Sequence, residues 1–366
     1  STATQDVTVT DNESPSISTT GAVTAINDAG QCKATVNLST PTTADNCAVS
    51  SVSSDAPGNS SYNVGTTTVN WTVTDIHGNT NTTTQDVVVI DEESPVILSP
   101  SSISVSVDAG QCEASVTVAA MSVTDNCSVS TVTNDYNGTS DASGTYPLGA
   151  TTVTWTATDI HGNSSTTTQS VTVLDTEDPT ISTTAVNVTA DAGVCTAAVT
   201  VAGPTTSDNC SVATVTNDYN STSDASGTYD VGTTTVTWTV TDIHGNSSTD
   251  TQSVTVTDDE NPSITAAADQ TQTVDAGVCT AAVSVVGPLT GDNCAVAEVV
   301  NDYNNTSDAS DTYDVGTTTV TWIVTDTHGN SSTDTQDIIV TDDEDPVFSA
   351  AVNQSQNTAA GQCNQT

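Results

Sequence analysis

Basic residues are almost absent from this sequence. The 366 residues contain 45 acidic side chains and a single basic one, Lys33, which gives a formal net charge of -44. Such a chain cannot neutralise the phosphates of a nucleic acid, and anionic lipid surfaces repel it. Nucleic-acid binding and direct membrane insertion are therefore not expected. The same charge works against a compact fold unless solvent or bound cations screen it.

Aromatic residues and long apolar runs are also scarce. Aromatics make up 3% of the chain, and no apolar run has membrane-spanning length. Low aromatic content with abundant Thr, Ser and Asp is compatible with disorder, but apolar residues alternate with Thr over long stretches. Such alternation is typical of strands with one face in the core and one in water. No segment shows helical periodicity, so an all-β fold is predicted.

One motif, Asp-x-Glu-x-Pro, organises the sequence. Its prolines follow one another at intervals of 80, 84, 83 and 84 residues, at Pro15, Pro95, Pro179, Pro262 and Pro346. Within each period the landmarks Ala-Gly-x-Cys, Asp-Asn-Cys, Trp and His-Gly-Asn return in the same order. We therefore predict a tandem array with repeats at 12–91, 92–175, 176–258 and 259–342. The last strand of a preceding repeat is expected at 1–11, and the opening strands of a further repeat at 343–366.

The third repeat shows which strands to expect. Val236, Trp238 and Val240 alternate with threonines, which predicts a half-buried strand with Trp238 in the core. A second alternating run follows the His-Gly-Asn turn, and together the two predict a β-hairpin. Another hairpin is expected where 188–190 and 194–201 flank Asp191-Ala192-Gly193. About seven short strands per repeat fit an antiparallel, immunoglobulin-like β-sandwich, and the four sandwiches are expected to form an extended rod.

These motifs together resemble the hyalin repeat (HYR) domain. The resemblance rests on Asp-x-Glu-x-Pro, Asp-Ala-Gly-x-Cys, Thr-x-x-Asp-Asn-Cys, Tyr-Pro-Leu-Gly-Ala-Thr-Thr-Val-Thr-Trp-Thr-Ala-Thr-Asp and His-Gly-Asn, and covers essentially the whole chain. It implies an immunoglobulin-like fold in an extracellular adhesion protein or a bacterial-type surface protein. Bacterial members often carry further cysteines where this chain has Ser182–Thr184 and Ser247–Thr249, so their disulfide pattern cannot be copied.

The nine cysteines form four doublets, whose members are 15 positions apart, and one single residue. The doublets are Cys32/Cys47, Cys112/Cys127, Cys195/Cys210 and Cys279/Cys294, and the single residue is Cys363. Such an array predicts disulfides, and the spacing argues against zinc. Two pairings are open. A doublet can close on itself, but the strand between its members spans roughly 25 Å, whereas a disulfide needs Cα atoms within about 7 Å. End-to-end stacking of repeats instead favours Cys32 with Cys127, Cys112 with Cys210, and Cys195 with Cys294.

Calcium is the predicted cofactor, because it takes about six to eight oxygen ligands, mostly carboxylates and carbonyls. The linker acids, the Asp of Asp-Asn-Cys and the Asp before the hairpin turn are expected at one pole of a repeat, in a site similar to the interdomain calcium sites of cadherins. The alternative is a polar linker with Asx-turns. The candidate ligands are Asp11, Glu13, Asp91, Glu93, Asp175, Glu177, Asp258, Glu260, Asp342, Glu344, Asp45, Asp125, Asp208, Asp292, Asp75, Asp159, Asp242 and Asp326.

Histidines and glycosylation sequons both fall on predicted turns. One histidine per repeat precedes Gly-Asn, and His77, His161, His244 and His328 are interpreted as turn residues without a ligand or catalytic role. Asn-x-Ser/Thr sequons make six residues candidates for glycosylation, namely Asn137, Asn163, Asn220, Asn246, Asn305 and Asn330.

The predicted function is structural rather than enzymatic. A repeated sandwich surface offers no unique pocket with perturbed carboxylates, and no repeat carries an irregular insertion. Copies of one module suit a secreted or cell-surface spacer, stalk or filament shaft, rigidified by calcium and disulfides. Its partners would be further repeats of the same chain or neighbouring copies in a fibre. The alternative is an adhesin module that binds a surface glycan, another surface ligand or ice through an exposed threonine array.

Overall fold

The computed structural model describes residues 2–350, and all the regular secondary structure assigned in that range is β-strand. The all-β prediction is therefore confirmed. The chain forms two compact units. One consists of the residues up to 178 together with the short segments 208–211 and 243–246, and the other of the remaining residues from 179 onward.

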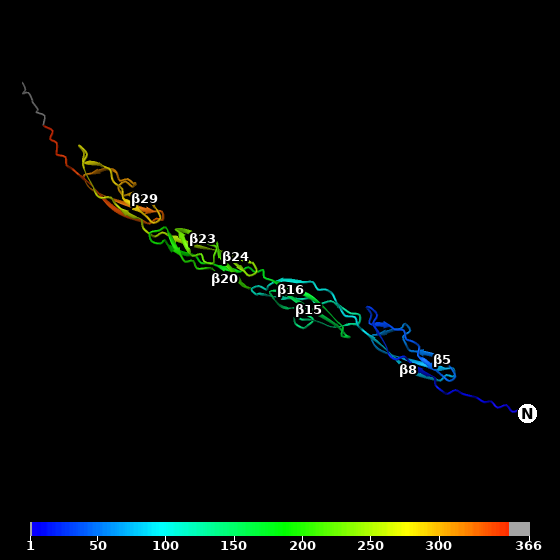
Figure 1. Ribbon diagram of the computed structural model, residues 1–366. Helices are drawn as coiled ribbons and strands as arrows, with labels where there is room; N and C mark the ends of the chain where they lie inside the picture. Colours follow the sequence, from blue (N-terminus) through cyan, green and yellow to red (C-terminus); the bar gives the residue numbers. More distant parts are fainter. Residues whose placement is uncertain (1, 351–366) are drawn as a thin grey trace, which may run out of the picture. The chain divides into compact units, whose positions relative to one another are not determined.

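Eight strands build the second repeat, which belongs to the first unit and is drawn in cyan to green in Figure 1. They are β9 Val96–Ile97, β10 Ile103–Ser106, β11 Glu113–Val116, β12 Val123–Thr124, β13 Val129–Asn134, β14 Gly144–Pro147, β15 Gly149–Asp159 and β16 Ser164–Leu174. A four-stranded sheet has the order β10-β16-β15-β13, whereas β11 pairs with β14 and β9 with β12. Side chains of β11, β14, β15 and β16 share one core, so the repeat is a β-sandwich.

The other repeats have the same order of strands. The first contains β1 Ser16–Ser18, β2 Val23–Ile26, β3 Lys33–Thr35, β4 Thr42–Ala44, β5 Val49–Ser54, β6 Ser61–Asn63, β7 Gly65–Asp75 and β8 Thr80–Ile90. The third contains β17 Thr180–Ser182, β18 Val186–Thr189, β19 Thr196–Val199, β20 Thr205–Ser207, β21 Val212–Asn217, β22 Gly227–Asp230, β23 Gly232–Asp242 and β24 Ser247–Thr257. The fourth contains β25 Ser263–Thr265, β26 Gln270–Thr273, β27 Thr280–Val283, β28 Leu289–Gly291, β29 Val296–Asn301, β30 Asp311–Asp314, β31 Gly316–Asp326 and β32 Ser331–Thr341.

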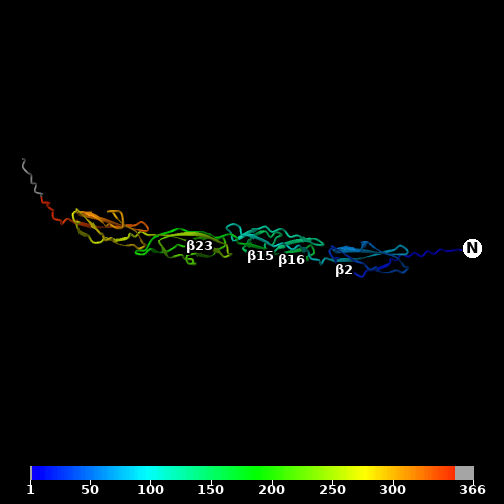
Figure 2. The same ribbon diagram turned by 90° about the horizontal axis from the view of Figure 1, so that it is seen from above.

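The hairpin predicted around the His-Gly-Asn turn is present in each repeat. In the second repeat β15 and β16 run antiparallel from Gly149↔Val173 to Thr158↔Ser164, side by side in both views (Figure 2). A glycine at the turn, Gly162, has φ +95°, a conformation that glycine adopts without the steric cost a Cβ imposes. Strict alternation over eleven residues fixes both the strands and their register.

The second predicted hairpin, around Asp191-Ala192-Gly193, is wrong. β18 pairs with β24 and β19 pairs with β22, so the turn carries the chain from one sheet of the sandwich to the other. The pairing of β18 with β24 is also parallel, as it is for β10 with β16. The sandwich is therefore not purely antiparallel: one edge strand of each four-stranded sheet runs parallel to its neighbour.

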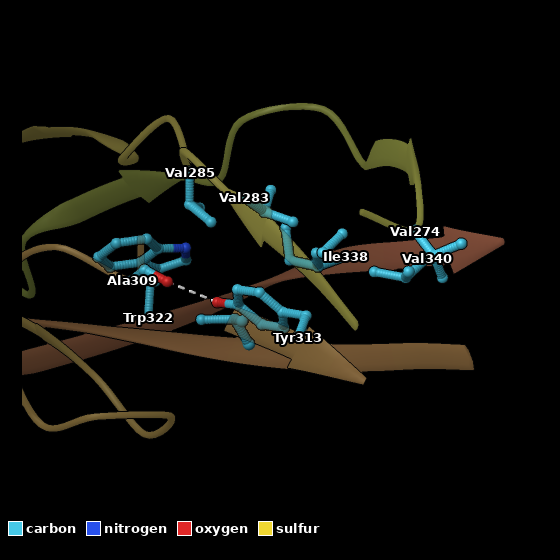
Figure 3. Close-up of a cluster of buried hydrophobic side chains, with 10 residues drawn as sticks. Val274, Val283, Val285, Ala309, Tyr313, Trp322, Ile338 and Val340 are labelled. Carbon is cyan, nitrogen blue, oxygen red and sulfur yellow. Dashed lines mark hydrogen bonds between the residues drawn. The ribbon is translucent and has the colours of Figure 1, made fainter. Parts of the chain in front are cut away.

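Each repeat encloses one tryptophan, as the alternation predicted. Trp155, Trp238 and Trp322 are 0% exposed, and Trp71 is also buried. Figure 3 shows the fourth core, where Trp322 and Tyr313 lie among valines and Ile338. The Tyr313 hydroxyl donates to the Ala309 carbonyl at 2.6 Å, so its polar atom is satisfied.

No strand is assigned at either end of the described residues. The segment expected to be the last strand of a preceding repeat at 1–11 forms no strand over residues 2–11, because no described strand pairs with it. The opening strands expected at 343–366 fall largely at 351–366, outside the described residues, and residues 343–350 contain none.

Candidate functional site

Disulfides join neighbouring repeats. Residues 2–350 contain three such bonds, Cys32–Cys127, Cys112–Cys210 and Cys195–Cys294, with Cα atoms 4.6, 4.9 and 4.6 Å apart. Each links the Ala-Gly-x-Cys turn of one repeat to the Asp-Asn-Cys of the next, which is the pairing that stacking favours. Among the described residues Cys47 and Cys279 are free and exposed, and Cys363 lies outside the described residues.

The linker aspartate is held by the hairpin turn of the following repeat. Oδ2 of Asp91 lies 3.0 Å from Nδ1 of His161, and the Asp91 side chain is 0% exposed. The amide of Asn163 donates to the Asp91 carbonyl at 3.1 Å. The same His–Asp contact occurs at His77–Asp11, His244–Asp175 and His328–Asp258. The histidines are turn residues, as predicted, but their contact with the linker was not predicted.

The turn itself is ordered by its first residue. Asp159 Oδ1 accepts the N–H groups of His161 and Asn163 at 2.8 and 2.9 Å, and its Oδ2 accepts the Asn163 amide at 2.8 Å. Burial raises the pKa of Asp159, but the hydrogen bonds from Asn163 and the turn backbone outweigh burial, so the pKa is lowered overall. The ionised carboxylate therefore positions the side chains that clamp the linker.

A second bridge crosses the junction through the Asn of Asp-Asn-Cys. The Asn126 amide donates to the Gln31 carbonyl and to Asp91 Oδ1, both at 3.2 Å. Asn209 and Asn293 make the equivalent contacts, with Gln111 and Asp175 in one case and with Val194 and Asp258 in the other. In the sequence, the only indication of this bridging role is that an Asn directly precedes the second cysteine of every doublet.

The linker glutamate faces the preceding repeat. The backbone N–H of Gly30, in the Ala-Gly-x-Cys turn, donates to Glu93 Oε1 at 2.9 Å and to Oε2 at 3.0 Å. Glu177, Glu260 and Glu344 accept from Gly110, Gly193 and Gly277 in the same way. These glutamates, predicted to be ligands together with the aspartates, accept hydrogen bonds that order the turn carrying the cysteine. Glu93 and Asp125 still line one hollow of about 490 Å³.

Three of the predicted ligands do meet in the first repeat. Asp11, Asp45 and Asp75 have carboxylate oxygens that all lie within 4.8 Å of one another. Asp45 Oδ2 accepts the N–H groups of Cys47 and Ala48 at 2.8 and 2.9 Å, whereas its Oδ1 is buried without a hydrogen-bond partner. The same is true of Oδ1 in Asp125, Asp208 and Asp292. Asp342 is exposed.

The sequons fall into two groups. The amide of Asn163 donates to both Asp91 and Asp159, and that of Asn330 donates to both Asp258 and Asp326, so a glycan on either would replace an N–H of the clamp. Asn246 also donates to Asp175. Asn137 and Asn220 lie in exposed loops and donate to Asp141 and Asp224. In the fourth repeat Asn304, which donates to Asp308, holds this position, and not Asn305.

Comparison with known proteins supports an array of HYR domains. The sequence model of the HYR domain matches residues 10–89 and 90–173, and the third and fourth repeats share their strand order and junctions. The chain is 31% identical to hyalin of Strongylocentrotus purpuratus over 363 residues, covering 95% of this chain and 29% of that protein. It is also 31% identical to hyalin of Lytechinus variegatus, over 87% of this chain and 61% of that protein.

The chain thus spans less than two thirds of either relative. Both come from sea urchins, and the comparisons give no support to the bacterial-type origin that the resemblance suggested. Among solved structures, the protocadherin gamma B2 domains 1–5 match with a TM-score of 0.34 at 14% identity, over 91% of this chain and 82% of that one. In the described part of the chain, no helix has the length and apolar character needed to cross a membrane.

Proposed function

We propose that this chain is part of an extracellular structural protein, a spacer, stalk or filament shaft. In this protein the junctions between repeats would hold neighbouring repeats together and resist bending. The observation that carries the proposal is one junction built three times, with the same disulfide, the same His–Asp contact and the same Asn bridge. Disulfides persist in oxidising compartments outside the cell, which supports secretion. Further repeats or neighbouring copies in a fibre are the proposed partners.

Electron microscopy of the full chain tests this role. A spacer should appear as extended particles of uniform length, and reduction of the disulfides should make them bend. Compact particles, with or without reductant, would overturn the proposal.

We further propose that calcium binds at the junctions. Carboxylates as close as those of Asp11, Asp45 and Asp75 repel one another, and buried oxygens without partners are costly. Asn126, Asn209 and Asn293 add a buried, unpartnered Oδ1 at each junction. A hard cation that takes oxygen ligands fits this set of donors. When bound, the ion would supply positive charge to a chain with one basic side chain, and the hydrogen bonds of His161 and Asn163 would keep the linker in register.

Calorimetric titration of the full chain with calcium chloride tests the site. We expect heat of binding and a rise in melting temperature, since a ligand that binds only the ordered state stabilises it. Asp208→Asn should remove one site. Asp230→Asn is the matched control, because Asp230 is exposed on β22 and loses the same charge. Absence of calcium uptake at millimolar concentration, or equal loss in both variants, would contradict the calcium site.

The alternative function, glycan binding, is favoured by one face of the third repeat. The paired outward positions of β21, β23 and β24 carry only hydroxyl side chains, including the cross-strand pairs Thr237↔Thr251 and Thr239↔Thr249. A regular, uncharged hydroxyl surface stands out on a chain of net charge -44. It suits a neutral polysaccharide, whose own hydroxyl groups both donate and accept hydrogen bonds.

Retention on immobilised neutral polysaccharides measures this alternative. The doubly substituted chain Thr239→Asp/Thr249→Asp should lose retention, and Thr312→Asp, which adds a charge on the smaller sheet of the fourth repeat, should keep it. No retention of the unaltered chain would remove the alternative while leaving the structural role in place.

A further inference from the structure

Several sequons in turns and loops use their asparagine amides for contacts within the protein. The Asn163 amide donates to both Asp91 and Asp159. That of Asn220 donates to the Asp224 carbonyl at 2.7 Å. An N-glycan is attached through the amide nitrogen and replaces one of its two N–H groups. The folded chain therefore accepts a glycan most easily on an exposed asparagine whose amide has no partner in the protein.

The sequon Asn187-Val188-Thr189 lies instead in a strand, β18. Asn187 and Thr189 are exposed, whereas the valines on either side of Asn187 are partly buried and pack against the third core. Because successive side chains of a strand point to opposite faces, the asparagine and the threonine of this sequon share the outer face. Within residues 2–350, neither side chain takes part in a hydrogen bond. Both groups that define the sequon are therefore free and face solvent.

The strand β18 borders the uncharged hydroxyl surface of the third repeat. The sheet has the order β18-β24-β23-β21, and β23 and β24 are labelled in Figure 1. Asn187 lies opposite Thr255 of β24. Thr255 lies in turn opposite Thr233 of β23, and their hydroxyl oxygens are 3.1 Å apart. A neutral sugar chain on Asn187 would therefore meet hydroxyl groups rather than carboxylates.

The backbone of β18 forms an unpaired sheet edge. On the side away from β24, no described strand pairs with it. The backbone N–H and C=O groups of such an edge can pair with a strand of another chain, which leads to aggregation. A bulky hydrophilic group attached to β18 would block this sideways pairing.

The other repeats have no asparagine at the corresponding position. Thr24, Ser104 and Thr271 hold it in β2, β10 and β26, each opposite the equivalent residue of the neighbouring strand. In the second repeat Ser104 is exposed, and Ser106 follows two residues later on the same face. A single substitution, Ser104→Asn, would therefore reproduce the sequon of the third repeat in the same strand of the second.

We propose that Asn187 carries an N-linked glycan, which covers the outer edge of β18 and extends over the hydroxyl surface of the third repeat. The proposal rests on the secretion proposed above, because N-glycans are transferred in the secretory pathway. The donor is an oligosaccharide carried on a lipid diphosphate. The amide nitrogen of Asn187 forms a bond to the anomeric carbon of the sugar and loses one proton, while the bond from that carbon to the diphosphate oxygen breaks and the lipid diphosphate leaves.

Peptide mapping of the full chain, secreted from eukaryotic cells, tests the site. Cleavage before aspartates releases residues 178–190, in which Asn187 is the only asparagine, and residues 159–174, in which Asn163 is the only one. Neither peptide contains a cysteine, so disulfides do not complicate the map. Mass spectrometry before and after enzymatic removal of N-glycans should find most copies of 178–190 modified and 159–174 unmodified.

Three variants separate the sequon from its surroundings. Thr189→Ala keeps Asn187 but should abolish the modification, whereas Thr189→Ser keeps the hydroxyl group and should retain it. Ser104→Asn should add a glycan to residues 91–107, which contain no asparagine in the unaltered chain. Circular dichroism checks that every variant is folded.

Two results would overturn the proposal. One is an unmodified peptide 178–190 from cells that glycosylate a reference secreted protein. The other is equal modification of Asn163 and Asn187, because the contacts of the Asn163 amide would then have no influence. Recovery of the chain from the medium measures secretion separately, and the microscopy is performed on chain without glycan. A missing glycan on Asn187 therefore leaves the structural role in place.

Discussion

Nδ1 of His161 lies 3.0 Å from Oδ2 of Asp91, a carboxylate that is 0% exposed and belongs to the linker before the repeat of the histidine. The contact ties the hairpin turn of one sandwich to the chain segment leaving the other. It recurs in every repeat, so the turn serves the junction as well as its own hairpin.

Replacing His161 should weaken its junction without unfolding a sandwich. His161→Ala leaves the buried Asp91 carboxylate with one partner fewer, and such losses cost about 1–3 kcal/mol. Hydrogen exchange should accelerate at residues 91–95 and stay unchanged at 175–179, where His244 makes the same contact. Equal exchange at both linkers would show that the histidine contact contributes nothing to order.

Reduction should free the junctions while the cores persist. None of the four cores contains a cysteine among its buried apolar residues, so the sandwiches do not depend on the disulfides for packing. With reductant, we expect proteolysis at the Asp-x-Glu-x-Pro linkers and unchanged tryptophan fluorescence. A large shift of the fluorescence would mean that the disulfides hold the cores together.

The tryptophan at the centre of each core dominates the stability of its repeat. Trp238→Ala should cost about 3–5 kcal/mol and lower the melting transition of the third repeat alone. Thr251→Ala, at an exposed position on the neighbouring strand, is the control and should change little. Calorimetry that shows all four repeats melting earlier would instead indicate one cooperative unit.

The buried tyrosine of the fourth core should ionise at a higher pH than an exposed tyrosine. Burial raises the pKa of Tyr313 to about 12, with Tyr303, Asp311 and Asp308 adding to the effect. Because the unfolded value is about 10, the stability due to Tyr313 is full below about pH 10 and is lost as pH rises through about 12. When the folded chain is titrated with base, the tyrosinate absorbance should rise in steps, and the step at the highest pH should be missing in Tyr313→Phe. A Tyr313 that ionises near pH 10 would contradict its burial.

The sequence predicted what depends on local alternation. Val236, Trp238 and Val240 identified a strand, its buried face and its hairpin partner, because period two leaves one arrangement that buries the apolar side chains. The turn at Asp191 was misread as a hairpin, because a turn between two short apolar runs looks the same whether its strands pair or enter different sheets.

The site was harder to predict than the fold. Asp11, Asp45 and Asp75 were expected together and do lie close together. The side chain of Glu93, in contrast, contacts the preceding repeat, because the Gly30 N–H that it accepts lies there. The roles of His161 and Asn126 likewise depend on contacts between repeats, which no spacing within one repeat reveals. Asn304 takes the loop position assigned to Asn305, because the two residues form overlapping sequons.

Disulfide mapping of the unreduced chain tests the junctions most directly. Trypsin is of little use with one lysine, but cleavage before aspartates separates the peptide of Cys32 from that of Cys47, since Asp45 lies between them. Mass spectrometry should find Cys32 joined to Cys127, Cys112 to Cys210 and Cys195 to Cys294. Peptides that join Cys32 to Cys47, or Cys112 to Cys127, would contradict the account, because those bonds leave the repeats without a covalent link.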